Sequence, residues 1–159
     1  MTASASRRRW LKTALLVQGA GAAARSAAAA DLPVPVSLAD ELARALAQNS
    51  PLLVLVTLRG CPFCRIATEN YLIPLRREQG LSIVQIDMRS RQLVQGFSGP
   101  GQSQENLSRL WGIKLAPTVL FFGRGGLEVA ERLVGGYLPD FYGSYLDERV
   151  RVARSAVRA

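Results

Sequence analysis

The stretch LLVLVTLRGCPFCRIATENY, residues 52–71, decides the fold of this 159-residue chain. It opens with an apolar run of the kind found in a strand that is buried on both faces of a parallel sheet. After Arg59-Gly60, Pro62 suits the first position of a helix, and the residues that follow can continue that helix. The sequence therefore predicts a strand, a tight turn and a helix, with Cys61 and Cys64 at the start of the helix.

Cys61 and Cys64 are the only cysteines of the chain, which has no histidine. Two thiols separated by two residues at a helix start can close a small disulfide ring and reopen it, and the helix N-terminus favours the thiolate of the first cysteine. We therefore interpret the pair as a redox dithiol with Cys61 as the nucleophile. Two alternatives stay open. One is half of a zinc site shared across a dimer, since structural zinc needs about four ligands, and the other is a structural disulfide, whose short loop stabilises little.

The first 30 residues have the pattern of a removable export signal. A basic region over 6–12 is followed by an apolar segment too short to span a bilayer and by the alanine run 27–30. The basic region resembles the twin-arginine signal Ser-Arg-Arg-x-Phe-Leu-Lys, with Trp10 in place of phenylalanine. The weak hydrophobicity and Arg25 also favour that route. A disordered tail or an uncleaved membrane anchor is the alternative.

We predict cleavage near Ala30, which leaves residues 31–159 as a periplasmic domain. Five of the 20 lysines and arginines lie before this point and none of the 12 acids does, so 15 bases face 12 acids in the mature chain. The basic character of the whole chain is thus largely a property of the signal. The C-terminal arginines alternate with acids as on a solvated helix face, and nothing supports nucleic-acid binding. We expect no membrane span in the mature chain.

The mature chain has the pattern of one domain of alternating helices and strands. The expected elements are a helix over 38–48 capped by Ser37, a strand over 52–58, a helix from 62 that bends or ends near Pro74, a strand over 82–87, an irregular stretch over 88–102, a short helix over 103–111, a strand over 116–122, a return strand over 128–134 and a helix from Asp140. Phe141, Tyr145, Leu146 and Val150 form the expected apolar stripe of the last helix. Right-handed crossovers convert this order into an α/β fold, a central mixed β-sheet flanked by helices on both faces.

From about residue 37 to 152 the chain resembles the thioredoxin superfamily. The residues that carry the resemblance are Cys61-Pro62-Phe63-Cys64 after a buried strand, the run 112–118 before the predicted hairpin, and 135–137 after it. The resemblance implies a thioredoxin-like fold and thiol–disulfide oxidoreductase activity. Within the superfamily the chain is most similar to exported thioredoxins associated with sulfur oxidation, partly because of its long segment over 87–102.

The resemblance also assigns site roles. It implies a redox-active pair, Cys61 and Cys64, and a client-binding set, Pro62, Phe63, Ala116 and Pro117. Pro117 corresponds to a cis-proline that faces the cysteines, leaves the neighbouring backbone open to an extended client, and keeps metals off the thiols. The alternative is an ordinary trans proline at a strand start. We expect neither a cofactor nor a metal.

Two positions depart from the thioredoxin pattern. Leu55 stands where thioredoxin has a buried aspartate, and Gly60 stands where tryptophan is usual. The nearest polar residues, Thr57 and Arg59, are not obvious general bases, so we expect proton transfer through water. Pro62 makes the motif more similar to those of glutaredoxins and oxidases than to Cys-Gly-Pro-Cys, which indicates a less reducing centre.

The function expected from these features is reduction of disulfides in client proteins by a monomeric periplasmic oxidoreductase. Because the periplasm is held oxidising, a reductase there needs electrons from a membrane donor. Two other functions remain open. One is a disulfide oxidase or isomerase, which the lack of a large helical insertion and of a dimerisation domain disfavours. The other is a redox-inactive binding module on the same fold.

Overall fold

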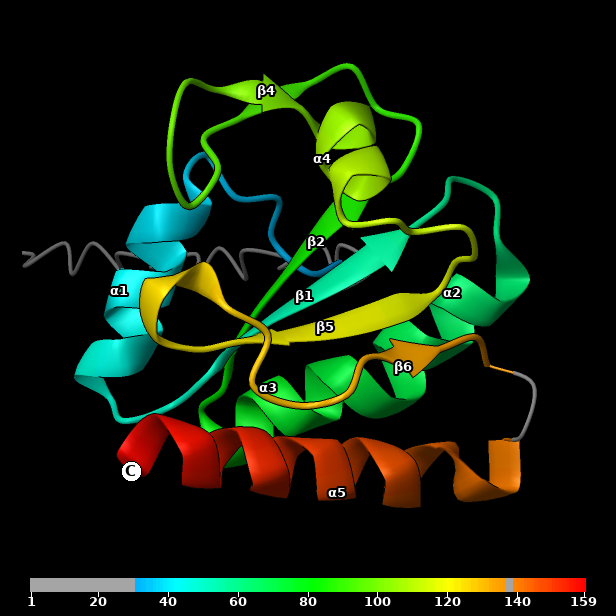
Figure 1. Ribbon diagram of the computed structural model, residues 1–159. Helices are drawn as coiled ribbons and strands as arrows, with labels where there is room; N and C mark the ends of the chain where they lie inside the picture. Colours follow the sequence, from blue (N-terminus) through cyan, green and yellow to red (C-terminus); the bar gives the residue numbers. More distant parts are fainter. Residues whose placement is uncertain (1–30, 137–138) are drawn as a thin grey trace, which may run out of the picture.

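The structure, a computed structural model, describes residues 31–136 and 139–159. The predicted signal over 1–30 and Tyr137 lie outside the described residues. In chain order the elements are α1 (Leu38–Ala47), β1 (Leu52–Thr57), α2 (Pro62–Ala67), the π-helical turn η1 (Thr68–Leu72), α3 (Ile73–Gln79), β2 (Ser82–Asp87), β3 (Leu93–Val94), β4 (Gln102–Ser103), α4 (Gln104–Leu110), β5 (Thr118–Phe122), the 3-10 turn η2 (Arg124–Gly126), β6 (Leu133–Val134) and α5 (Pro139–Arg158) (Figure 1).

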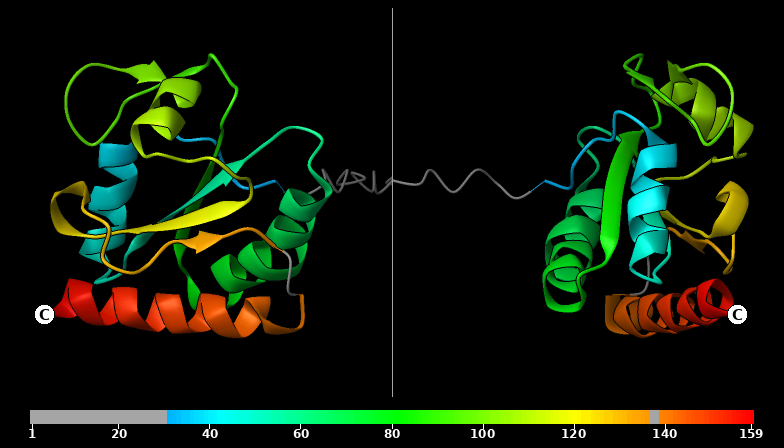
Figure 2. Two further views of the ribbon diagram at one scale, coloured as in Figure 1. Left: turned by 45° about the vertical axis from the view of Figure 1, so that its right-hand side comes forward. Right: turned by 90° about the vertical axis from the view of Figure 1, so that its left-hand side faces the viewer.

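The central sheet has four strands in the order β2-β1-β5-β6. β1 pairs parallel with β2 and antiparallel with β5, and β6 is antiparallel to β5. The sheet is therefore mixed, and Figure 2 shows helices on both sides of it. The expected α/β architecture is confirmed, and the apolar run at 52–56 is completely buried in the strand that lies at the middle of the fold.

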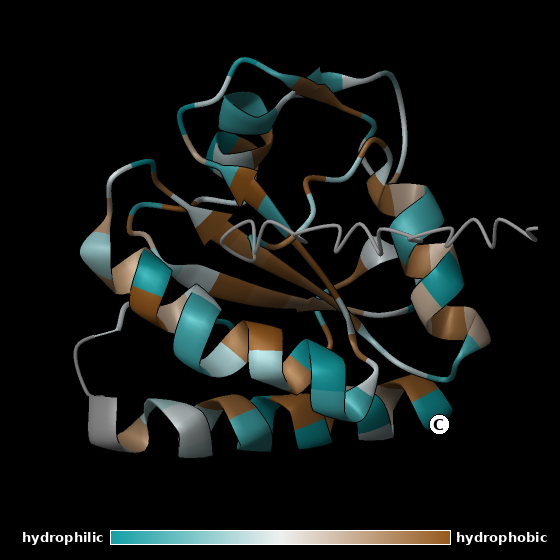
Figure 3. Ribbon diagram, turned by 180° about the vertical axis from the view of Figure 1, so that it is seen from behind, coloured by the Kyte–Doolittle hydropathy of each residue, from teal (hydrophilic) through white to brown (hydrophobic). Residues whose placement is uncertain are grey.

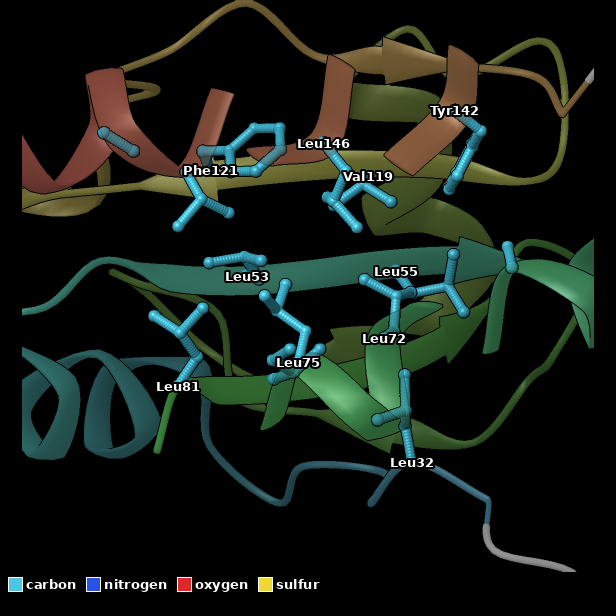
Figure 4. Packing of buried hydrophobic residues seen from close by; sticks show 14 residues of the cluster. Leu32, Leu53, Leu55, Leu72, Leu75, Leu81, Val119, Phe121, Tyr142 and Leu146 are labelled. Atoms are coloured by element: carbon cyan, nitrogen blue, oxygen red, sulfur yellow. The ribbon is translucent and has the colours of Figure 1, made fainter. Parts of the chain in front are cut away.

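Alternate residues of β1 serve two separate cores, as the period of two in a strand requires. Leu53 and Leu55 face α2, α3 and α5 in one cluster (Figure 4). Val54 and Val56 face α1 and α4 in the other. Figure 3 shows the same division in the hydropathy of the residues. The middle of the sheet is apolar, whereas the helices alternate apolar and polar residues. Burial on both faces fixes the register of β1, and so fixes where the cysteines that follow it lie.

The predicted apolar stripe of α5 is wrong in two members. Phe141 and Tyr145 are 58% and 47% exposed. The face that packs on the sheet consists instead of Tyr142, Leu146, Val150, Ala153 and Val157. Phe141–Tyr145 and Tyr142–Leu146 are neighbouring i, i+4 pairs, and only the second pair is continued along the helix by buried residues at the right spacing.

Three other expectations need smaller corrections. The helix that contains Cys64 does not stop at Pro74 but continues through the widened turn η1 into α3. This widening lets a proline, which has no N–H to donate, lie within the helical run. The segment over 88–102 contributes the short ladder of β3 and β4 instead of being wholly irregular. The return strand is only two residues long, and an isolated bridge joins Glu128 to Phe122.

The extended entry segment before α1 is attached both to β2 and to Gln95, which follows β3. Gln85 donates its N–H to the Pro33 carbonyl at 2.9 Å, and Gln95 donates its N–H to the Val36 carbonyl at 2.9 Å. Leu32 is only 2% exposed and belongs to the core below α2 and α3 (Figure 4). The segment before α1 is therefore part of the folded domain from Leu32 onward.

Candidate active site

The turn between β1 and α2 depends on a glycine. Gly60 has a φ of +77°, in the left-handed region that residues with a side chain rarely adopt. Nothing lies within 4 Å of where its side chain would be, so the backbone angle and not a lack of space selects glycine here. The turn lets the chain leave β1 and enter α2 with Cys61 at the boundary.

Cys61 is the N-cap residue of α2. Its Sγ accepts the backbone N–H of Cys64 at 3.2 Å, which is the hydrogen bond that a capping side chain normally makes. Pro62 occupies the first helical position, where its missing N–H costs nothing. Cys61 is only partly buried, so its sulfur combines solvent access with the positive end of a helix, and both favour attack by the thiolate.

Cys64 has the opposite environment. It is only 3% exposed, and its pKa is raised to about 11, mainly by burial and next by its hydrogen bond with Cys61. Contacts with the Thr57 side chain and the Leu58 backbone lower this pKa but do not cancel the rise. At neutral pH Cys64 is therefore a thiol. The two cysteines are free, so the structure shows the reduced dithiol.

The predicted client-binding residues gather on one side of Cys61. The Ala116–Pro117 bond is cis, as expected, and the Ala116 carbonyl oxygen lies 3.9 Å from Cys61 Sγ. A side chain at Gly136 would lie 3.6 Å from the Phe63 Cβ and 3.7 Å from the Pro117 Cγ. Phe63 is 46% exposed, whereas Pro117 is buried. The fold thus brings α2, the loop before β5 and the exit from β6 together at the accessible sulfur.

A cavity of about 660 Å³ lies on another side of the cysteines. Its lining includes Thr57, Gln85 and Asp87 from the ends of β1 and β2, Cys64 and Thr68 from the helix, and Gln104 from α4. The Asp87 carboxylate accepts N–H groups of Arg59 and Arg89 at 3.2 and 2.8 Å. Gln104 Oε1 accepts the Asp87 N–H at 2.7 Å, while its Nε2 has no hydrogen-bond partner. Burial of an unpaired amide nitrogen is costly, so Gln104 is an unusual buried polar side chain beside the cavity.

Below the dithiol the interior is apolar. Leu55 is fully buried, and Tyr142 packs in the same core with its ring 4.9 Å from that of Tyr71. The pKa of Tyr142 is raised, first by burial and then by the negative charges that Cys64 and Tyr71 acquire when they ionise. Among the described residues, the buried polar side chains include no Asp or Glu, so no buried acid takes the place of the one missing at Leu55.

The sequence located the two cysteines and their client side but not the cavity. Thr57 and Asp87 are register partners in the parallel pair β1 and β2. Polar residues at the carboxyl ends of adjacent parallel strands are a recognisable signal, because ligands commonly bind there. Gln104 carried no such signal, since a glutamine at the start of a short helix is normally exposed.

Two general searches concern the described residues, 31–136 and 139–159. No group of three His, Cys, Asp or Glu side chains there could hold a metal ion. None of the helices in those ranges has the length and apolar character needed to cross a membrane.

Comparisons with known proteins agree with this geometry. Residues 38–148 match the model of the thioredoxin-like domain family. Mitochondrial thioredoxin 3 of Saccharomyces cerevisiae has a similar structure, with 13% identity over 76% of this chain and 93% of that chain and a TM-score of 0.52. Thioredoxin of Fasciola hepatica, with 20% identity over 76% and 97% of the two chains, gives a TM-score of 0.51. No curated protein matches the sequence. At these identities the structures support the fold alone, whereas the family match spans most of the chain and includes both cysteines: the chain belongs to the thioredoxin-like domain family.

Proposed function

We propose that the protein is a periplasmic thiol–disulfide oxidoreductase that reduces disulfides in client proteins. The observation that carries the proposal is the asymmetry of the dithiol. Cys61 is accessible at a helix N-terminus beside the Ala116 carbonyl, whereas Cys64 is buried with a pKa raised to about 11. An accessible attacker and a buried resolver are the two groups that a disulfide exchange cycle needs.

The reaction has two exchange steps. The Cys61 thiolate attacks one sulfur of a client disulfide, a Cys61–client bond forms, and the other client sulfur leaves as a thiolate that takes up a proton. Cys64 then loses its proton and attacks Cys61 Sγ, which releases the second client sulfur and closes the Cys61–Cys64 disulfide. The client gains two electrons and two protons, and the protein loses them. A separate donor of two electrons must reduce the disulfide before the next cycle.

Trapping separates the roles of the two thiols. Cys64→Ser keeps the attacker but lacks the second nucleophile, so disulfide-linked adducts with clients should accumulate and disappear with dithiothreitol. The adducts are measured on non-reducing gels after periplasmic expression. Adducts with a membrane protein as well as soluble clients would support the proposed membrane electron donor.

Cys61→Ser is the matched control, because the remaining Cys64 is buried and does not occupy the N-cap position. It should form no adducts. Equal trapping by both variants would contradict the assignment of roles, and trapping by neither would favour a redox-inactive binding module.

The alternative direction of electron flow is that of an oxidase, which would take electrons from client thiols. Pro62 after the first cysteine is the feature that favours an oxidase, since this motif resembles oxidase-like centres. Equilibration of the Cys61–Cys64 pair with glutathione measures the reduction potential directly. A value near that of thioredoxin, about −270 mV, supports the reductase, whereas one near −120 mV supports the oxidase.

A further inference from the structure

The buried Cys64 thiol must lose its proton before it can react. Under the proposed function, on which this inference rests, Cys64 must become a thiolate to attack Cys61, yet it is 3% exposed above a core that contains Leu55 instead of an acid. Two groups that stabilise its thiolate approach from the end of β1. They are the Thr57 side chain and the Leu58 backbone.

Thr57 is held in position by the sheet. It is the last residue of β1, paired in register with Asp87, and its side chain is on the same face as those of Leu53 and Leu55. That face is the one that α2 covers, so the hydroxyl is directed to the helix that carries Cys64. Rigid strand ends position such groups more accurately than loops do.

The influence of Cys61 on Cys64 changes during the cycle. In the reduced dithiol, the hydrogen bond with Cys61 and the negative charge of Cys61 both raise the pKa of Cys64. When Cys61 is bonded to a client sulfur it carries no charge, so this opposition ends. Burial then remains as the cause that raises the pKa, and Thr57 and Leu58 remain as the causes that lower it.

The cavity gives the proton a route. Thr57, Cys64 and Gln104 all line it. Its charged side chains are Asp31, Arg59, Arg65, Glu69 and Asp87, while β1 and α4 contribute the neutral Thr57 and Gln104. Besides Cys61, Tyr142 of α5 is the titratable neighbour that interacts with Cys64 from the core side.

We propose that the Thr57 hydroxyl activates Cys64 for the second exchange step by donating a hydrogen bond to its sulfur as the thiolate forms, while the proton passes to water in the adjoining cavity. The thiolate then attacks Cys61 Sγ, the Cys61–client bond breaks, and the departing client thiolate is protonated by water. Thr57 neither gains nor loses a proton in this step. It takes the place of a carboxylate by stabilising the charged product of deprotonation.

Thr57→Val tests this assignment, because valine has the same shape and lacks the hydroxyl. Reduced protein is mixed with dithiobis(nitrobenzoic acid), whose first coloured thiolate reports attack by Cys61 and whose second reports attack by Cys64. Thr57→Val should keep the first phase within about two-fold and slow the second by about ten-fold to a hundred-fold, the loss expected for one hydrogen bond to a charged group. The pH midpoint of the second phase should move upward by about one unit or more.

Thr57→Ser keeps the hydroxyl and should restore the second phase to within about three-fold of wild type. Thr57→Ala, which cannot overpack the site, should behave like the valine variant. A second phase in Thr57→Val as fast as in wild type, or a serine variant as slow as the valine variant, would overturn the assignment. Slowing of both phases alike would overturn it too. Absence of the first phase in wild type would instead contradict the proposed function.

Discussion

At the scale of single residues, two neighbouring positions on one face of β1 determine how the site handles protons. Leu55 keeps the core below the dithiol apolar, and Thr57 supplies a neutral donor at its edge. A neutral donor stabilises the thiolate without the cost of a second buried charge. The site therefore lacks a carboxylate base, and its core stays apolar.

Leu55→Asp tests whether the apolar residue at this position raises stability and slows proton transfer. The new carboxyl lies in an apolar strand, so its pKa should rise above the usual value of about 3.9 and the protein should lose about 3 kcal/mol or more of stability. Because the group is protonated in the folded state but ionised when unfolded, the loss should grow as the pH rises from about 4 through the raised pKa. The second exchange phase should become faster. Urea unfolding at several pH values and the two-phase assay measure both effects.

Leu55→Asn is the control for polarity without ionisation. It should lose stability with little dependence on pH and should leave the second phase unchanged. A second phase that is equally fast in the wild type, the aspartate variant and the asparagine variant would show that no base is needed at this position.

Residue-level prediction succeeded where spacing alone specifies geometry. Cys61 and Cys64 are separated by two residues, and this places both at one helix end whatever surrounds them. Gln104 could not be identified, because its burial results from packing between α4 and the end of β2, which lie 17 residues apart. The contact between Thr57 and Cys64 is likewise a tertiary one.

At the scale of elements, α5 shows what an apolar pattern leaves undecided. Two adjacent stripes were possible at its start, and the sheet selected the one through Tyr142 and Leu146. The short strands β3, β4 and β6 were missed or overextended for a related reason. Two-residue ladders are held by their partners, so the local sequence contains little of the information.

Substitutions on α5 distinguish the two stripes. Leu146→Ala removes a fully packed side chain and should cost about 2–5 kcal/mol of unfolding free energy. Phe141→Ala removes a larger but 58% exposed side chain and should change stability by less than about 0.5 kcal/mol. Urea unfolding measures both. A larger loss for Phe141→Ala would mean that α5 is rotated by about one residue.

At the scale of the whole molecule, the order of helices and strands was predictable because β1 and β5 are apolar runs, β2 carries buried Ile and Val, and the helices mix apolar and polar residues. The chain alternates these patterns between clear turn signals. Because connections between parallel strands are right-handed, few topologies are compatible with this order of elements. Export is the remaining proposal at this scale, and it rests on residues 1–30.

Replacement of both Arg7 and Arg8 by lysine should stop export, because the twin-arginine route depends on the guanidinium pair while the charge stays the same. Precursor should accumulate in the cytoplasm, as measured by fractionation and immunoblotting. Arg9→Lys, in the variable position of the pattern, is the matched control and should be delivered normally. Delivery of the double variant at the normal level would contradict this route.

The attachment of Pro33 to the sheet edge and of Val36 to Gln95 also bears on the proposed maturation. A signal peptidase needs an extended stretch of chain in its cleft, and from Leu32 onward the backbone is committed to the folded body. If the protein is exported already folded, as proposed, we expect cleavage before Leu32. The alanine run at 27–30 supplies small side chains next to that boundary. We therefore predict that the folded domain limits how far into the chain the peptidase can cut, which sequencing of the mature N-terminus would check.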